Sequence, residues 1–274
     1  MLFVILNLLD NKMTLYESTE RYLKGPDGMR NEVDMWYSGA CLLFQEIIRK
    51  KQGKGFGGLH EQKGIDIRRT LEPVSVLDVC CGPGNFANYV GLFYPEVDLT
   101  GIDINDEFLR SARERFGEYG WTFLRTDAVN FNLGRTFDFI LASSAYHHIE
   151  DREKIKFLQS IRNHLSEDGK VIVCDNFLPY HEDDDSRREA IHQYYNALIR
   201  YYSDGNATLE AIEIIKEVYQ LELEGEEEHK VHFQRFKEDI EKSGLEIEVD
   251  RVIWQPEQFR ADNAGSHVLI LKRR

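Results

Sequence analysis

The sequence has little of what marks a secreted or a membrane protein. Its 274 residues include only 4 cysteines and 6 prolines. Cys80 and Cys81 are adjacent, while Cys41 and Cys174 lie far away, a spacing that fits neither a disulfide framework nor paired metal knuckles. The apolar start, residues 1–9, is shorter than the roughly 20 residues that span a bilayer. We therefore expect a cytoplasmic protein with reduced thiols and no membrane segment.

Basic residues are also few in relation to acidic ones. Lys and Arg total 34 against 48 Asp and Glu, which gives a formal charge of −14. Because nucleic-acid binding depends largely on Lys and Arg that displace counterions, this balance argues against a nucleic-acid substrate and favours a small-molecule partner. The acidic run from Glu224 to Glu228 is expected to be a solvated face. A hydrophobic content of 42 % is typical of a packed globular protein.

Short apolar segments alternate with longer amphipathic ones in the middle of the chain. Strands are expected at residues 74–79, 97–104, 121–126, 137–143 and 169–175, with helices from about residue 85, at 107–116 and at 153–165. Continuous apolar strands separated by helices indicate a parallel sheet covered on both faces. Two last strands, 245–254 and 266–273, have no helix between them and must pair antiparallel. The sequence thus predicts an α/β fold with a doubly wound, mostly parallel seven-stranded sheet and an antiparallel C-terminal strand pair.

Helical segments flank this sheet in the predicted organisation. Residues 1–70 are predicted to form a helical N-terminal cover that ends in a flexible Gly- and Lys-rich loop, and residues 71–274 the main domain. A helical lid insertion is predicted at about 180–225. Asp183 and the two acids after it are expected to cap the first lid helix, worth about half a kcal/mol each. A metal site that includes His181 and Asp183 is the alternative.

An apolar strand runs into a glycine-rich turn and a helix in the segment VLDVCCGPGNFA. Gly82 and Gly84 permit a positive φ and close approach of a ligand, and the helix start offers free N–H groups. Asp78 lies before the turn, where a carboxylate would repel a pyrophosphate but suits an ammonium group. Asp103 ends the second strand, where an acceptor can take both ribose hydroxyls, and Asp127 follows the third strand, in reach of an adenine edge.

Through these motifs the sequence resembles the class I S-adenosylmethionine-dependent methyltransferases, over roughly residues 74–175. The CCGPG turn and the SSAYHHIED loop are most similar to small-molecule methyltransferases, including the quinone C-methylating group. The resemblance implies a Rossmann-like fold and S-adenosyl-L-methionine as cofactor, held by Asp78, Cys80, Gly82, Gly84, Asp103, Ile104, Asp127, Ala128 and Ser143. Cys80 departs from the family, which usually has a glycine there. A nicotinamide dehydrogenase and a bare doubly wound domain are the alternatives.

The loop after the fourth strand contains the candidate catalytic residues. Methyl transfer from a sulfonium is an in-line displacement, so the protein chiefly aligns the acceptor and excludes water. Tyr146, His147 and His148 are the candidates, because a neutral imidazole is a suitable base near pH 7. Alternatively, one histidine bonds the loop backbone and the other is exposed. Asp175 and Asn176 resemble the metal-binding pair of catechol-type O-methyltransferases, but the partner acid after the fourth strand is absent, so no metal is expected.

Side chains of the flanking helices are candidates for an acceptor pocket, namely Tyr16, Arg30, Tyr37, Tyr194 and Tyr195. These tyrosines would line a pocket for an apolar or aromatic acceptor and face the sulfonium. Alternatively, they are ordinary packing residues or part of a dimer surface, and a homodimer is possible. The sequence therefore predicts an S-adenosylmethionine-dependent methyltransferase with a small-molecule acceptor. A non-catalytic adenosylmethionine-binding protein is one alternative. The other is a tRNA-modification enzyme like carboxy-S-adenosylmethionine synthase, which the helical insertion also resembles.

Overall fold

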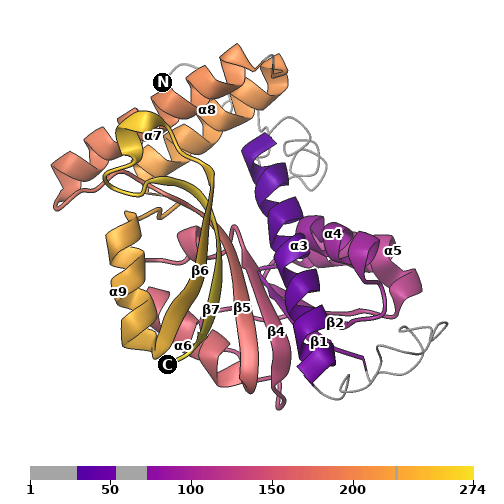
Figure 1. Ribbon diagram of the computed structural model, residues 1–274. Coiled ribbons are helices and arrows are strands. Elements are labelled where there is room, and N and C mark those ends of the chain that lie inside the picture. Colours follow the sequence, from indigo (N-terminus) through magenta and orange to yellow (C-terminus); the bar gives the residue numbers. More distant parts are fainter. Residues whose placement is uncertain (1–29, 54–72, 206, 226–227) are drawn as a thin grey trace, which may run out of the picture.

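A seven-stranded sheet forms the centre of the computed structural model, which describes residues 30–53, 73–205, 207–225 and 228–274 (Figure 1). The strands are β1 Ser75–Val79, β2 Asp98–Asp103, β3 Thr122–Arg125, β4 Phe137–Ser143, β5 Leu165–Phe177, β6 Leu245–Trp254 and β7 Gly265–Arg273. Their order is β3-β2-β1-β4-β5-β7-β6. The first five strands are parallel, and β7 is antiparallel to both β5 and β6. The predicted fold class is confirmed.

Helices cover both faces of this sheet. The α-helices are α3 Arg30–Gly53, α4 Asn85–Phe93, α5 Asp106–Phe116, α6 Lys154–His164, α7 Asp184–Asp204, α8 Leu209–Glu224 and α9 Phe233–Ser243, and the 3-10 helices are η3 Gly117–Tyr119, η4 Tyr146–His148 and η5 Glu257–Phe259. Helices α3, α4 and α5 pack on one face and α6 and α9 on the other (Figure 1). Val76 and Leu77 show the alternation that this requires, because they belong to opposite cores.

Short polar residues define where several helices begin. The Asn105 side chain caps α5 by accepting from the Glu107 and Phe108 N–H groups at 2.9 and 3.2 Å. Asp183 and Ser186 form a reciprocal capping box at the start of α7, as predicted for Asp183. These caps satisfy N–H groups that the first helical turn leaves without an intrahelical partner.

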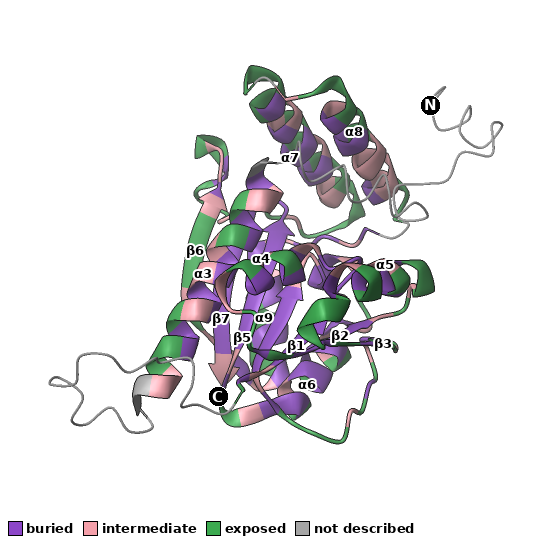
Figure 2. Ribbon diagram, turned by 90° about the vertical axis from the view of Figure 1, so that its right-hand side faces the viewer, coloured by how far each residue is buried: buried purple, intermediate pink, exposed green. Residues whose placement is uncertain are grey.

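Helices α7 and α8 lie in the segment for which the sequence predicts a lid insertion, and they stand apart from the two layers that cover the sheet (Figure 2). They pack on each other around a third apolar core, which also contains Leu178 after β5, Trp254 of β6 and Phe259. α7 follows directly on the carboxyl end of β5, so the insertion lies over that end of the sheet. None of the described helices has the length and apolar character needed to cross a membrane.

Candidate functional site

The turn between β1 and α4 consists largely of left-handed backbone. Cys80, Gly82 and Gly84 have φ values of 55°, 54° and 87°. A Cβ atom at Gly84 would lie 2.3 Å from the Phe116 ring, so only glycine fits there. The Gly82 N–H donates to Asp103 Oδ2 at 2.8 Å, and this bond ties the turn to the end of β2.

Asp78 lies beneath this turn as a buried carboxyl group. Its side chain is 1 % exposed, and Oδ2 has no hydrogen-bond partner within the described part of the chain. Burial and the nearby charge of Asp103 raise the pKa of Asp78 to about 8. Because an unpaired buried oxygen is costly, this position favours a ligand that brings a hydrogen-bond donor or a positive charge.

The next two strands end beside the turn. Asp103 is half-buried, and its Oδ1 accepts from the Asn105 N–H at 2.9 Å. Ile104 follows it with 65 % of its surface exposed. At the end of β3, Asp127 is exposed and accepts from the Val129 N–H at 2.8 Å, while Ala128 is buried. Thus the carboxyl ends of β2 and β3 present one half-buried acid, one exposed acid and an exposed apolar side chain.

In η4, after β4, Tyr146 holds the loop in place. Its hydroxyl donates to Asp239 Oδ2 of α9 at 2.8 Å, and the pKa of Tyr146 is raised by burial and by that carboxylate. The buried Lys154 Nζ donates to the carbonyls of Tyr146 and Ile149 at 2.8 and 2.7 Å. The Tyr146 side chain is therefore engaged with α9, and the loop is fixed at both its side chain and its backbone.

His147 lies against Asp175 of β5. Its Nδ1 is 2.5 Å from Asp175 Oδ1, and the Tyr146 and Asn176 N–H groups also donate to this carboxylate, at 3.1 and 2.8 Å. Burial opposes ionisation of Asp175, but these contacts hold its pKa below the ordinary value. Burial and, to a lesser extent, the Lys230 charge lower the pKa of His147 to about 4 against the opposing effect of Asp175. At pH 7 the imidazole is thus neutral, donates from Nδ1 and keeps Nε2 as an acceptor.

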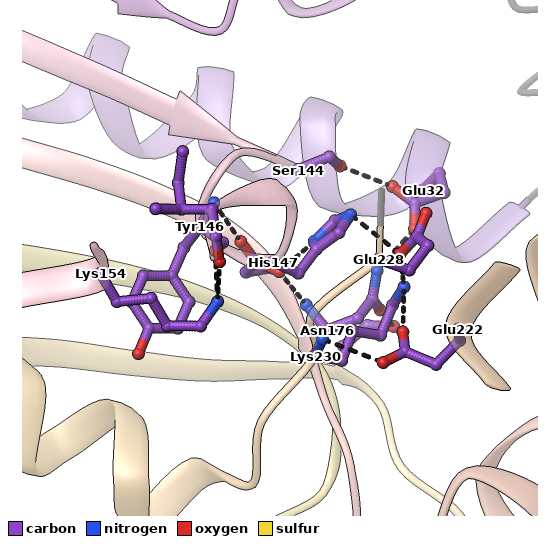
Figure 3. A network of polar contacts seen from close by, with 12 residues as sticks. Glu32, Ser144, Tyr146, His147, Lys154, Asn176, Glu222, Glu228 and Lys230 are labelled. Atoms are coloured by element: carbon purple, nitrogen blue, oxygen red, sulfur yellow. Dashed lines mark hydrogen bonds and ion pairs between the residues drawn. The ribbon is translucent and has the colours of Figure 1, made fainter. Parts of the chain in front are cut away.

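The neighbouring Asn176 is engaged with protein groups instead of offering a metal ligand. Its Nδ2 donates to Glu32 Oε1 of α3 at 2.7 Å, and its Oδ1 accepts from the hydroxyls of Tyr194 and Ser266 at 3.1 and 2.6 Å. Glu32 also accepts from Ser144 Oγ at 3.1 Å, and burial raises its pKa (Figure 3). Sequence reasoning missed Glu32, because a single acid in an amphipathic helix carries no signal of this contact.

The acidic run after α8 is not wholly solvated, which corrects the sequence-based expectation. Glu228 is 1 % exposed and Lys230 is 4 % exposed. The Lys230 ammonium group forms ion pairs with Glu228 and with Glu222 of α8 (Figure 3). Arg187 of α7 also contacts Glu222. Glu228 Oε2 lies 3.8 Å from His147 Nε2. The insertion is therefore joined to the loop after β4 by buried charges that the run of glutamates did not reveal.

The predicted pocket residues have different surroundings. Tyr194 and Tyr195 are both 1 % exposed, and the Tyr195 hydroxyl has no hydrogen-bond partner among the residues that the structure describes. Tyr37 is 54 % exposed and packs edge-on against Phe93 of α4 with ring centroids 5.6 Å apart. Because it lies on the outer side of α3, we leave Tyr37 out of the proposed site. Tyr16 and the Arg30 side chain lie outside the described residues.

Comparisons with known proteins show which enzymes the chain is similar to. Residues 76–169 match the family model described as a methyltransferase domain. A methyltransferase of Bacillus cytotoxicus is 26 % identical over 176 residues, which cover 62 % of this chain and 74 % of that protein. A demethylmenaquinone methyltransferase of Thermotoga maritima is 25 % identical over 147 residues, 51 % of this chain and 62 % of the relative. The matched residues 76–169 are a class I S-adenosylmethionine-dependent methyltransferase domain.

A solved structure shows the same fold for this methyltransferase. The complex of LepI with S-adenosylmethionine aligns with a TM-score of 0.51 at 11 % identity, over 82 % of this chain and 46 % of LepI, so the chain spans about half the length of that protein. The enzyme's cofactor is S-adenosylmethionine, and the unpaired Asp78 oxygen fits the ammonium group of such a ligand. Cys80 takes the left-handed conformation, which glycine adopts readily, at the position where the family usually has glycine. Such a conformation costs about 1–2 kcal/mol for a residue with a Cβ atom.

Proposed function

We propose that the methyltransferase transfers the methyl group to a small-molecule acceptor at the carboxyl ends of β4 and β5. The observation that carries this proposal is the burial of the polar groups around His147, which is itself only 5 % exposed. Glu228 and Lys230 cover it from the segment after α8, and Tyr194 lies nearby through its bond to Asn176. A macromolecular acceptor needs an open surface, which these contacts do not favour.

We assign the cofactor to the carboxyl ends of β1, β2 and β3. Asp78 and the backbone of Gly82 and Gly84 hold the methionine part, and Asp103 accepts from the ribose hydroxyls. Ile104, Asp127 and Ala128 bound the adenine, and Ser143 and Cys80 complete the set at the ends of β4 and β1. Bound S-adenosylmethionine supplies a methyl group on a positively charged sulfur. The support for this assignment is the unpaired, buried Asp78 oxygen together with the left-handed turn.

The proposed role of the protein at the acceptor is alignment and proton acceptance. Asp175 fixes the orientation of His147 so that Nε2 is the acceptor, and His148 lies beside it with ring centroids 4.2 Å apart. We assign Tyr146 to anchoring this loop, because its hydroxyl is engaged with Asp239. Tyr195 is the lid residue best suited to contact the acceptor, since its hydroxyl has no partner among the described residues.

The test is the formation of S-adenosylhomocysteine with a panel of small acceptors, at saturating cofactor. The panel includes quinols such as demethylmenaquinone analogues, because one relative is named for that acceptor, together with phenols and carboxylic acids. We expect turnover with at least one acceptor and its loss in His147→Gln. His192→Gln on α7 is the matched control and should keep the wild-type rate.

Two results would overturn parts of this proposal. Cofactor binding without turnover across the whole panel favours a non-catalytic adenosylmethionine-binding protein. Wild-type rates in both His147→Gln and His148→Gln remove the histidines from the reaction.

A further inference from the structure

We propose that His147, His148 and Glu228 form a binding site for one divalent transition-metal ion, such as Zn²⁺ or Co²⁺. Each of the three residues offers one ligand atom, and these atoms all lie within 4.8 Å of one another. They come from two segments far apart in the sequence, η4 and residues 228–232, which form the return from the lid to α9. Figure 3 shows His147 directed toward Glu228. The sequence predicted no metal here, because neither segment alone contains a complete ligand set.

The distances suit a metal ion after a small adjustment. Zinc binds imidazole nitrogen and carboxylate oxygen at about 2.0–2.2 Å, so two ligands of one tetrahedral ion lie about 3.4 Å apart. His147 Nε2 and Glu228 Oε2, at 3.8 Å, need to approach each other by about 0.4 Å. The widest pair of the set lies within 4.8 Å and must close by up to about 1.4 Å, a distance that side-chain rotation can cover. His148 is half-buried, so its side chain has room to make that shift.

A second group prepares His147 as a ligand. Asp175 accepts from Nδ1, which leaves the Nε2 lone pair on the side of Glu228. Metal-binding histidines usually donate their other N–H to a carboxylate or a carbonyl in this way. Asp175 is itself completely buried and held by the Tyr146 and Asn176 N–H groups. The imidazole therefore has one orientation, and it is the orientation that a metal ion needs.

The surrounding charges also favour a cation. The carboxylates of Asp175, Glu222 and Glu228 outnumber the cationic groups of Lys230 and Arg187 in this cluster. Lys230 contacts both Glu228 and Glu222. When Glu228 binds a metal ion, the Lys230 ammonium group therefore keeps Glu222 as its partner. Lys230 can give up one of its two ion pairs without becoming an unpaired buried charge.

The ligand chemistry selects the class of metal. Two imidazoles and one carboxylate suit Zn²⁺, Co²⁺ and Fe²⁺, whereas Mg²⁺ and Ca²⁺ prefer oxygen ligands alone. Three protein ligands leave at least one position for water or another small ligand. Nε2 of His147 has a single lone pair, so a metal ion and the proton of an acceptor compete for it. This last point rests on the proposed function, and it predicts that Zn²⁺ inhibits methyl transfer.

The test uses the full chain without an affinity tag, after treatment with a chelator. Zn²⁺ is titrated calorimetrically, and Co²⁺ is followed by its visible absorption, which reports tetrahedral coordination. We expect one ion per chain in the wild type and in the control His192→Gln, with binding at least tenfold weaker in His148→Gln and in Glu228→Gln. The half-buried His148 is the safer substitution, because Glu228→Gln also removes an ion pair from Lys230.

S-adenosylhomocysteine binding by the same samples shows that each variant is folded and keeps the two proposals distinguishable. Absence of a stoichiometric ion in the wild type overturns the metal site, as does equal affinity in the wild type and both folded variants. Neither result affects the acceptor assay. Conversely, one bound ion per chain without turnover of any acceptor leaves the metal site standing and removes the proposed reaction.

Discussion

Replacement of Asp78 by asparagine should stabilise the ligand-free methyltransferase and at the same time weaken its binding of cofactor. Burial and the charge of Asp103 raise the pKa of Asp78 to about 8, whereas an unfolded aspartate titrates near 3.9. Between these values the native protein holds a proton that the unfolded chain lacks, so the free energy of unfolding falls as the pH rises from 4 to 8. At about 1.36 kcal/mol for each of four units, the upper limit of this loss is about 5 kcal/mol. Asparagine does not titrate, so the free energy of unfolding of the variant should increase relative to that of the wild type as the pH rises from 4 to 8.

The same carboxyl group should release a proton when the cofactor product binds. At pH 7 a group with a pKa of about 8 is roughly nine-tenths protonated, and pairing with an ammonium group requires the ionised form. We expect about 0.9 proton released for each S-adenosylhomocysteine bound, and about tenfold tighter binding at pH 7 than at pH 6. Calorimetry in two buffers of different ionisation enthalpy measures the release. Asp78→Asn should release none and bind at least a hundredfold more weakly, about 3 kcal/mol.

Two results would refute this reasoning about Asp78. Wild-type affinity in Asp78→Asn means that no ammonium group pairs with this carboxyl group. Unfolding curves of the two proteins that remain parallel from pH 4 to pH 8 mean that the pKa is not raised. Each result can occur without the other, so binding and burial are tested separately.

Three further substitutions test other parts of the enzyme. Gly84→Ala should lower the free energy of unfolding by about 3 kcal/mol, because its Cβ would meet the Phe116 ring at 2.3 Å in left-handed backbone; a urea midpoint equal to that of the wild type would contradict this. Asp103→Ala should weaken S-adenosylhomocysteine binding by about 1–3 kcal/mol, and an unchanged calorimetric affinity removes the ribose assignment. Burial lowers the pKa of Lys154 to about 8, so between this value and 10.5 the unfolded chain holds a proton that the native protein lacks. As the pH rises through that range, the free energy of unfolding of the wild type should increase by up to about 3 kcal/mol relative to that of Lys154→Met. A difference in unfolding free energy that stays constant with pH would argue against the low pKa.

The sheet could be predicted from the sequence because its signals are local. Each strand is a short apolar run, and the lack of a helix between the last two strands dictates their antiparallel pairing. The limits of this approach appear at the start of β5, which begins at Leu165 instead of residue 169. Leu165 pairs with Phe137 across an irregular register, and the polar residues that follow it give no strand signal. Pairing with a partner strand, not the local pattern, sets this boundary.

The acceptor side of the site was much harder to predict, because its residues become neighbours only through folding. Glu228 belongs to a run of glutamates, a pattern typical of a solvated surface. It is nevertheless buried, because the Lys230 ammonium group, which also pairs with Glu222, provides its counter-charge. Glu32 lies far from Asn176 in the chain, yet the two side chains form a hydrogen bond at 2.7 Å. Helical periodicity gives the buried face of a helix, but not the residues that face it.

The cofactor side, whose residues the sequence identifies, and the acceptor side, whose residues become neighbours only on folding, should respond separately to substitution. The proposed cofactor side depends mainly on the carboxyl ends of β1, β2 and β3, where the Gly82 to Asp103 bond ties the β1 turn to the end of β2. The acceptor side depends on α3, η4, β5 and the return from the lid. These segments are joined by side-chain contacts and by backbone bonds such as that from the His229 N–H to the His147 carbonyl at 2.7 Å. Substitution at Lys230 should therefore change acceptor turnover while S-adenosylhomocysteine affinity stays within about twofold, because no ion pair of Lys230 reaches the turn. A Lys230→Met variant that loses both in parallel, while still folded by circular dichroism, would show that the lid and the cofactor turn are energetically coupled.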